Sequence, residues 1–323
     1  MSCIRTVRGQ FRRPDSAAFI PCKKRRLQET PEKFTRAAPF PFPRKEAALK
    51  RILTIQDISC LGTCSLTIAL PVISALGSEA VILPTAVLST HTMFSNYTYK
   101  DLADQIEPIA RHWKSEGIAF DAIYTGYLGT VGHIDKVLGL IRDFRGPDTI
   151  VFVDPVIGDN GRLYPAFDMA YVRKNTELCA AADIIVPNIT EGAFMTGMEY
   201  RETHDEAYIK EMLRRLAAFG AKVSALTGVS LEPGMIGVMG YDRTSGEHFT
   251  YQRPRIGDAY HSTGDLFSST CIGTILKGRD WRDAMRIAAD YTARTIEVSL
   301  RNPARLRYAV DFEKTLPELI AMQ

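Results

Sequence analysis

The sequence predicts an α/β fold in which a mainly parallel sheet is covered by helices on both faces. From Arg51 onward, short apolar segments of strand length alternate with longer amphipathic segments of helix length. The apolar segments are nearly continuous, which is typical of parallel strands buried on both sides. A chain of 323 residues with 46% hydrophobic content can fill one such core. Because no repeat or composition break follows residue 50, we expect one domain over residues 49–323.

The elements are expected in a regular order along the chain. Six strands are expected at 51–55, 80–83, 122–124, 150–153, 184–186 and 223–226. Helices are expected around 64–76, 102–113, 133–144 and 206–219, and further helices start near 188 and 266. A late hairpin is predicted at 235–239 and 248–251, and two closing helices begin at Trp281 and Asp311.

The basic character of the chain belongs to its first 50 residues, which hold 13 Lys/Arg against 4 Asp/Glu. We interpret residues 1–48 as a disordered basic extension containing a proline run, or as the product of a start site placed too far upstream. A transit peptide or a nucleic-acid tag is the alternative. The remainder is acidic and has no basic stripe, so no nucleic-acid partner is expected.

The composition also excludes two other classes of protein. No apolar run approaches the roughly 20 residues that span a bilayer, so no membrane partner is expected. The six cysteines show no metal-ligand spacing, which favours free thiols in a cytoplasmic protein.

The turn at residues 260–267 combines small residues with a carboxylate. Ser262, Thr263 and Gly264 precede an apolar helix, whose first amides lack intrahelical partners and attract anions. Asp265 would repel that anion, so we expect it to act as a base toward an attacking hydroxyl. The alternative is an ordinary N-cap at Ser262 or Thr263, with Asp265 as a favourable first-turn charge.

Polar side chains follow almost every predicted strand. The carboxyl ends of parallel strands lie at one edge of a sheet, where ligands bind. We therefore expect these positions on one rim: Asp57, Ser59, 89–92, 125–127, 154–159, 187–191 and 227–228.

Four of these residues carry the hard oxygen donors that Mg²⁺ prefers, namely Asp154, Asp159, Asn188 and Glu191. Asn188 and Glu191 are three apart at an expected helix start, so both side chains can face one site. The alternatives are a capping box formed by Asn188 and Glu191, and simple turn chemistry for Asp154 before Pro155. Together with the turn at residues 260–267, which we call the anion turn, these acids favour a metal–nucleotide site.

These segments resemble the pyridoxal kinases of the ribokinase-like superfamily, particularly their bacterial pyridoxine/pyridoxamine kinase branch. The resemblance covers residues 51–298 and rests on six segments in the same order: 55–57, 89–92, 125–127, 154–159, 187–191 and 262–265. It implies a ribokinase-like three-layer sandwich and ATP-dependent phosphorylation of the hydroxymethyl group of vitamin B6 vitamers. It also implies Mg²⁺, a stimulating monovalent cation such as K⁺, and a homodimer.

The resemblance implies a role for each matching residue. Asp265 matches the general base, and the amides of Ser262, Thr263 and Gly264 match the anion hole. The positions matching the ATP site are Asp154, Asn188, Glu191, Thr227 and Gly264. Those matching the Mg²⁺ site are Asp154, Asp159 and Glu191. Those facing the substrate are Asp57, His91, Thr92, Tyr127 and Asp265.

Two positions depart from the family pattern. Ser262 replaces the first glycine of a Gly-Thr-Gly-Asp turn, which costs about 1 kcal/mol if φ is positive there. If φ is negative, the serine fits and its hydroxyl is free to contact phosphate. Asp57 stands where many members carry serine, and it favours a protonated pyridine or an amine on the substrate. The alternative is that Asp57 caps the following helix.

Two further functions stay open. One is a hydroxymethylpyrimidine kinase of thiamin synthesis, because Thr92 and Tyr127 favour a flat ring over a sugar without separating pyridine from pyrimidine. The other is a catalytically impaired nucleotide- or B6-binding homologue, which Ser262 suggests. The retention of Asp154, Asp265 and the Asn188–Glu191 pair argues against it.

Overall fold

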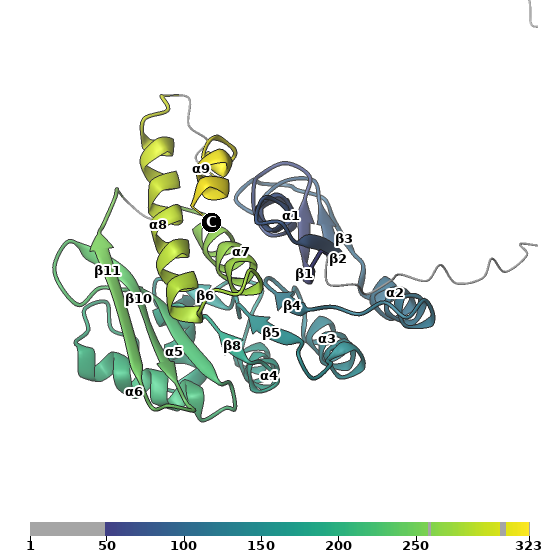
Figure 1. Cartoon of the computed structure of the whole chain (residues 1–323), viewed down its shortest axis with the longest axis horizontal. Coiled ribbons are helices and arrows are strands. Elements are labelled where there is room, and N and C mark those ends of the chain that lie inside the picture. Colours follow the sequence, from purple (N-terminus) through teal and green to yellow (C-terminus); the bar gives the residue numbers. More distant parts are fainter. Residues whose placement is uncertain (1–48, 258–259, 304–307, 323) are drawn as a thin grey trace, which may run out of the picture. The chain divides into compact units, whose positions relative to one another are not determined.

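The computed structural model describes residues 49–257, 260–303 and 308–322. Within them, a large sheet is covered by helices on both faces, which confirms the expected three-layer α/β architecture (Figure 1). The extension predicted over residues 1–48 lies outside the described residues.

The main sheet has nine strands in the order β11-β10-β9-β8-β5-β4-β1-β2-β3. Their bounds are β1 (Arg51–Ser59), β2 (Glu79–Leu88), β3 (Tyr99–Asp101), β4 (Ala122–Thr125), β5 (Ile150–Val153), β8 (Ile184–Ile185), β9 (Val223–Val229), β10 (Met235–Asp242) and β11 (His248–Pro254). The six strands from β2 to β9 in this order pair in parallel, whereas β3, β10 and β11 pair antiparallel with their neighbours. The carboxyl ends of the parallel strands therefore lie at one edge.

Helices pack on the two faces of this sheet as separate sets (Figure 1). One set is α1 (Leu66–Ala75), α7 (Thr263–Leu276), α8 (Trp281–Leu300) and α9 (Leu316–Ala321), the last preceded by the short 3₁₀ helix Phe312–Lys314. The other is α2 (Ala103–Ser115), α3 (Val131–Phe144), α4 (Met169–Ala180), α5 (Ile189–Thr196) and α6 (Glu206–Ala217). Successive residues of β1 divide between the two cores: Ile52 packs with the first set and Leu53 with the second.

Several elements differ from the sequence expectation. β1 continues to Ser59, because residues beyond Ile55 keep their parallel pairing with β2 across a register shift. Asp57 therefore lies inside a strand, and the expectation that it follows the strand or caps the next helix is wrong; Ser65 occupies the N-cap position of α1. Thr227 likewise lies inside β9.

Four elements were not expected from the sequence. β3 is short, and β6 (Gly158–Asp159) and β7 (Arg162–Leu163) form a separate two-stranded hairpin. The Asn160-Gly161 pair between them has positive φ at both residues, the usual signal of a tight hairpin turn. α4 begins after Asp168, whose side chain accepts from the amides of Ala170 and Tyr171. Both signals were readable in the sequence.

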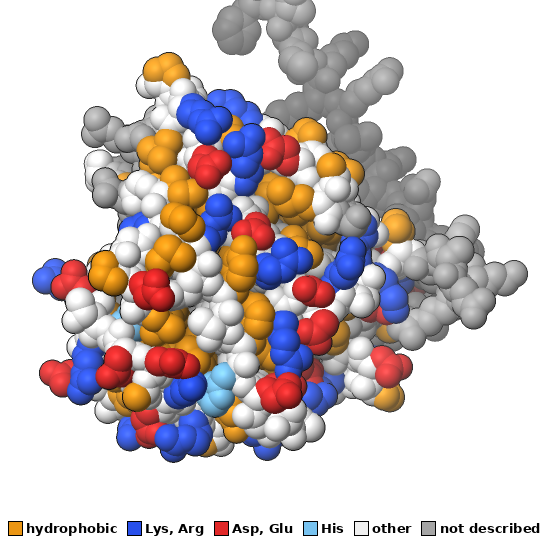
Figure 2. Space-filling model, turned by 60° about the vertical axis from the view of Figure 1, so that its left-hand side comes forward, with side chains coloured by type: hydrophobic (Ala, Val, Ile, Leu, Met, Phe, Trp, Pro, Cys, Tyr) orange, Lys and Arg blue, Asp and Glu red, His pale blue; other side chains and the backbone are white. Residues whose placement is uncertain are grey.

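Two observations concern the helices and one face of the described chain. None of its helices has the length and apolar run that crossing a bilayer requires. On the face drawn in Figure 2, acidic and basic side chains are interspersed and do not form an extended basic stripe.

Candidate active site

The start of α7 is a helix terminus without a side-chain cap. Ser262 occupies the N-cap position with φ 67°, and its side chain makes no capping hydrogen bond. Its hydroxyl is buried and has no partner among the described residues. The Thr263 hydroxyl donates to the carbonyl of Tyr260 at 3.1 Å instead of capping the helix. Ser262 and Asp265 thus lie where the N-cap alternative places them, but neither hydroxyl caps the helix, and the first amides of α7 remain available to an anion.

Asp265 lies in this first turn and is held by a distant segment. Its Oδ2 accepts a hydrogen bond of 2.9 Å from the amide of Ser65, at the start of α1. Burial raises the pKa of Asp265 to about 7; the charges of Asp154 and Asp57 add to the shift, and the Ser65 hydrogen bond opposes it. A carboxyl group with this pKa is suited to accept a proton near neutral pH.

Asp154 lies next to the start of α7. It follows β5, its side chain is buried, and its Oδ2 accepts from the Ser268 hydroxyl at 2.8 Å. A Cβ atom built on Gly264 would lie 3.9 Å from the same Oδ2. Burial raises the pKa of Asp154, and the neighbouring charge of Glu191 raises it further. The structure thus brings this predicted ATP-side residue to the anion turn.

The start of α5 is fully capped. Asn188 accepts from the Glu191 amide at 3.0 Å, while Glu191 Oε2 accepts from the Asn188 amide at 2.8 Å. Glu191 Oε1 accepts from the Ile157 amide at 2.8 Å, and Asn188 Nδ2 donates to the Gly158 carbonyl at 2.8 Å. The capping-box alternative is therefore confirmed. The bonds with Ile157 and Gly158 also fix the 154–159 loop against α5.

The residues around Glu191 fit an incomplete cation site. Burial raises the pKa of Glu191, and the charge of Asp159 adds to the shift while backbone amides oppose it. Asp159 is exposed, and it accepts from the Asn160 amide at 2.8 Å. Among the described residues, no three His, Cys, Asp or Glu side chains are arranged to hold one metal ion. The donor set therefore fits Mg²⁺ only where one or two carboxylates are joined by phosphate oxygens and water.

Thr227 lies beside this site. It forms an isolated parallel bridge with Asn188, and its amide donates to the Pro187 carbonyl at 3.0 Å. The bridge brings the middle of β9 to the start of α5, next to residues that match the nucleotide site.

Asp57 and Tyr127 lie near one another, and the charge of Asp57 also acts on Asp265. Asp57 is 5% exposed, and burial raises its pKa, while hydrogen bonding from the Ser65 side chain opposes the shift. Burial and the charge of Asp57 raise the pKa of Tyr127 to about 12. The Tyr127 ring lies 5.6 Å from that of Phe167. These residues supply a partly apolar wall with one carboxylate.

His91 and Thr92 lie in the connection between β2 and β3. The amide of His91 donates to the Leu61 carbonyl at 2.8 Å, and a Cβ atom on Gly62 would lie 2.7 Å from the His91 Cβ. The His91 ring is 5.7 Å from that of His261, just before the anion turn. Burial and His261 lower the pKa of His91, which favours its neutral form. Thr92 is exposed.

Three residues around the site have an unusual backbone conformation, and sequence reasoning anticipated only Ser262. Ser65 (φ 48°), Val156 (φ 44°) and Ser262 (φ 67°) all have positive φ, although none is glycine. Such strain persists only where surrounding contacts impose it, and it gathers at functional sites. Each of these three residues adjoins Asp154 or Asp265. Nothing in the sequence marked Ser65 or Val156, because their roles depend on contacts between distant segments.

The arrangement brings a carboxyl group of raised pKa, helix amides without intrahelical partners and further carboxylates to one rim. It can accept a proton from a hydroxyl at Asp265 and stabilise an anion in front of α7. It can also hold a cation between Asp154, Glu191 and bound phosphates. These are the requirements of phosphoryl transfer to an alcohol.

Comparison with known proteins is consistent with this geometry. A family model described as phosphomethylpyrimidine kinase matches residues 69–306. A Bacteroides thetaiotaomicron protein, provisionally named a phosphomethylpyrimidine kinase and crystallised with pyridoxal, is 36% identical with a TM-score of 0.80, covering 84% of this chain and 96% of that chain. Pyridoxal kinase from Lactobacillus plantarum is 29% identical with a TM-score of 0.78, covering 85% and 98%. The Dictyostelium discoideum pyridoxal kinase is 27% identical over 237 residues, 69% of this chain and 77% of that protein.

Proposed function

Because the chain belongs to the phosphomethylpyrimidine kinase family, we propose that it is an ATP-dependent kinase of vitamin B6 vitamers. It transfers the γ-phosphoryl group to the 5′-hydroxymethyl group of pyridoxal, pyridoxine or pyridoxamine, in salvage of pyridoxal 5′-phosphate. The observation that carries the proposal is Asp265, a carboxyl group of raised pKa in the first turn of an uncapped helix.

In this proposal Asp265 removes the proton from the vitamer hydroxyl. Its raised pKa places it near the proton affinity that general-base catalysis at neutral pH requires. The amides of Ser262, Thr263 and Gly264, together with the dipole of α7, stabilise the charge on the transferred group. Ser65 holds the carboxylate toward the acceptor side through its amide.

ATP occupies the side of Asp265 formed by Asp154, Asn188, Glu191 and Thr227. Mg²⁺ supplies charge neutralisation for the phosphates, and Asp154, Glu191 and Asp159 are the residues that would hold it, with phosphate and water completing its coordination. Asp154 and Glu191 are buried carboxylates that form no ion pair with a described residue, which supports this part of the proposal. A stimulating K⁺ ion belongs to the same proposal.

The vitamer ring occupies the other side, among Asp57, His91, Thr92 and Tyr127. The partly apolar wall of Tyr127 and Phe167 supports a flat aromatic acceptor. Asp57 lies deep beside it, where a carboxylate favours a protonated ring nitrogen or an amine on the acceptor. We extend the proposal to a homodimer in the cytoplasm, which sedimentation of the purified chain and localisation of a tagged chain would test.

The experiment measures ADP release by the purified full chain with Mg-ATP and each of five acceptors: pyridoxal, pyridoxine, pyridoxamine, hydroxymethylpyrimidine and ribose. Turnover on a B6 vitamer supports the proposal. Turnover on hydroxymethylpyrimidine alone would keep the mechanism and move the protein to thiamin synthesis, as the family description would allow. No turnover on any acceptor, with ATP or a vitamer still bound, would make the chain a binding protein.

A further inference from the structure

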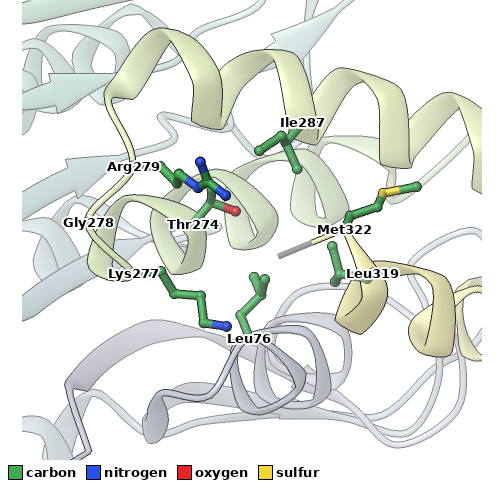
Figure 3. A pocket seen from close by; sticks show the side chains of 8 residues that line it. All are labelled: Leu76, Thr274, Lys277, Gly278, Arg279, Ile287, Leu319 and Met322. Atoms are coloured by element: carbon green, nitrogen blue, oxygen red, sulfur yellow. The ribbon is translucent and has the colours of Figure 1, made fainter.

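A cavity of about 520 Å³ lies at the other end of α7, away from the candidate active site (Figure 3). Its lining includes Thr274, nine residues after Asp265 and therefore roughly 13 Å farther along the helix. The volume is within the usual range for sites that bind small molecules. The cavity is thus separate from the proposed site of phosphoryl transfer.

Part of the wall is apolar and comes from three helical segments. Leu76 follows α1, Ile287 lies on α8, and Leu319 lies on α9. In Figure 3 these side chains project into the same space from different sides. An apolar portion of a ligand would be removed from water here.

The turn between α7 and α8 adds two cations to the rim. Lys277 and Arg279 flank Gly278, whose φ of 89° permits the tight turn. Neither cation forms an ion pair with any residue that the structure describes. One explanation is favourable interaction with the carboxyl end of the α7 dipole, which needs no ligand.

The helix dipole accounts for the two cations, but it does not account for the buried hydroxyl of Thr274. Its side chain is 4% exposed, yet Oγ1 has no hydrogen-bond partner among the described residues. Figure 3 shows the Thr274 oxygen and the Arg279 guanidinium group both projecting into the cavity. A buried hydroxyl without a partner is uncommon, and it leaves one donor and acceptor for a bound molecule.

The charges beside the cavity indicate which part of it an anion would occupy. An adjoining hollow contains Arg286 together with Asp283 and Asp290. Arg286 lies 3.7 Å from each of these carboxylates, so its charge is already balanced there. An anion is therefore favoured at Lys277 and Arg279 and disfavoured beside the two aspartates.

We propose that this cavity binds a small anionic metabolite that carries an apolar portion, such as an aryl or alkyl phosphate. The phosphate is held by Lys277, Arg279 and the Thr274 hydroxyl, and the apolar portion contacts Leu76, Ile287 and Leu319. This binding does not depend on the proposed kinase activity.

The test uses phenyl phosphate as the probe and the Met322 methyl group as a local reporter, since Met322 also lines the cavity. The full chain is labelled with ¹³C-methyl methionine, and Met322→Leu assigns the resonance. Phenyl phosphate should shift this resonance in a saturable way. Binding at the anion turn of α7 should instead perturb Met93, whose amide donates to the His91 ring, 5.7 Å from that of His261, so the two sites are distinguishable.

The matched variants are Lys277→Gln/Arg279→Gln and Arg111→Gln/Arg173→Gln. The second pair removes the same charge from exposed positions on α2 and α4, where neither arginine forms an ion pair with a described residue. The cavity variant should weaken the Met322 response by at least about tenfold, because it removes both charged hydrogen bonds. The control pair should leave it unchanged, and Thr274→Val should weaken it by about threefold.

Three results would overturn the proposal. They are the absence of a saturable Met322 shift in the wild-type chain, an equal shift in the Lys277/Arg279 variant, and an equal loss in both double variants. The last would show that net charge alone attracts the probe.

Discussion

The helices α5 and α7 begin on the same rim, but they differ in how their first backbone amides are satisfied. At α5 the Asn188 and Glu191 side chains both complete the capping box. At α7 the Ser262 side chain makes no cap, its backbone is left-handed, and its hydroxyl has no partner in the described chain. Both starts carry an acid in the first turn, but only Asp265 lies at an uncapped one.

The difference shows that Glu191 has a structural task that Asp265 lacks. Glu191 accepts amide hydrogen bonds of 2.8 Å from Asn188, which completes the cap, and from Ile157, which fixes the 154–159 loop to α5. Asp265 accepts one amide bond at 2.9 Å and lies among amides that have no intrahelical partner. We infer that α5 holds the site together while the start of α7 binds and transfers the phosphoryl group.

The largest expected effect comes from Asp265→Asn. The asparagine keeps an oxygen for the Ser65 amide but cannot take the proton, so kcat should fall by roughly a thousandfold or more. Steady-state ADP release with Mg-ATP and pyridoxal measures it. Thermal unfolding of the same variant is the control, and its midpoint should not fall. A variant that keeps most of its turnover would remove Asp265 from the mechanism.

Glu191→Gln should lower stability in addition to weakening the proposed Mg²⁺ site. The amide replaces an acceptor that faces backbone N–H groups, so the free energy of unfolding should fall by about 1–3 kcal/mol. Urea denaturation measures the change, and Glu202→Gln, at an exposed position without an ion pair in the described chain, is the matched control. Equal stability of the two variants would contradict a structural role for Glu191.

Removing the N-cap side chain should affect stability differently at the two helix starts. Asn188→Ala deletes a formed cap and should cost about 1 kcal/mol of unfolding free energy. Ser262→Ala deletes a hydroxyl that makes no cap, so its stability should stay close to wild type. The urea midpoints of the two variants give the comparison, and a matching loss in Ser262→Ala would show that its hydroxyl has a structural partner.

Ser262→Gly should give a small effect on stability, in the opposite direction to Asn188→Ala. Glycine adopts φ 67° without the strain of a side chain, so stability should rise by up to about 1 kcal/mol. Comparison with Ser262→Ala isolates backbone strain, since both variants lack the hydroxyl. A glycine variant less stable than the alanine variant would be inconsistent with strain at this position.

Much of the architecture was predictable because it depends on local pattern. The continuous apolar strands and amphipathic helices indicated the parallel sheet, and the strand ends placed Asp154 and Asn188 on one rim. The Asn160-Gly161 turn and the Asp168 cap also had readable signals that were missed.

The rest of the site depends on contacts between distant segments. The Ser65 amide reaches Asp265 across 200 positions in the sequence. The sequence also left open whether φ at Ser262 is positive, and which helix start is capped. The same residue types are compatible with either outcome, so only the folded backbone decides between them.

The most direct test of the account is the pH dependence of kcat/KM for pyridoxal, measured for wild type and Asp265→Asn. A general base must be ionised, so kcat/KM should be constant above the pKa of about 7 and fall about tenfold per pH unit below it. In Asp265→Asn the low residual kcat/KM should no longer show this fall below the pKa, which is the acidic limb of the profile. If the variant keeps the same limb, another group is the base, and the proposed role of the α7 start is wrong.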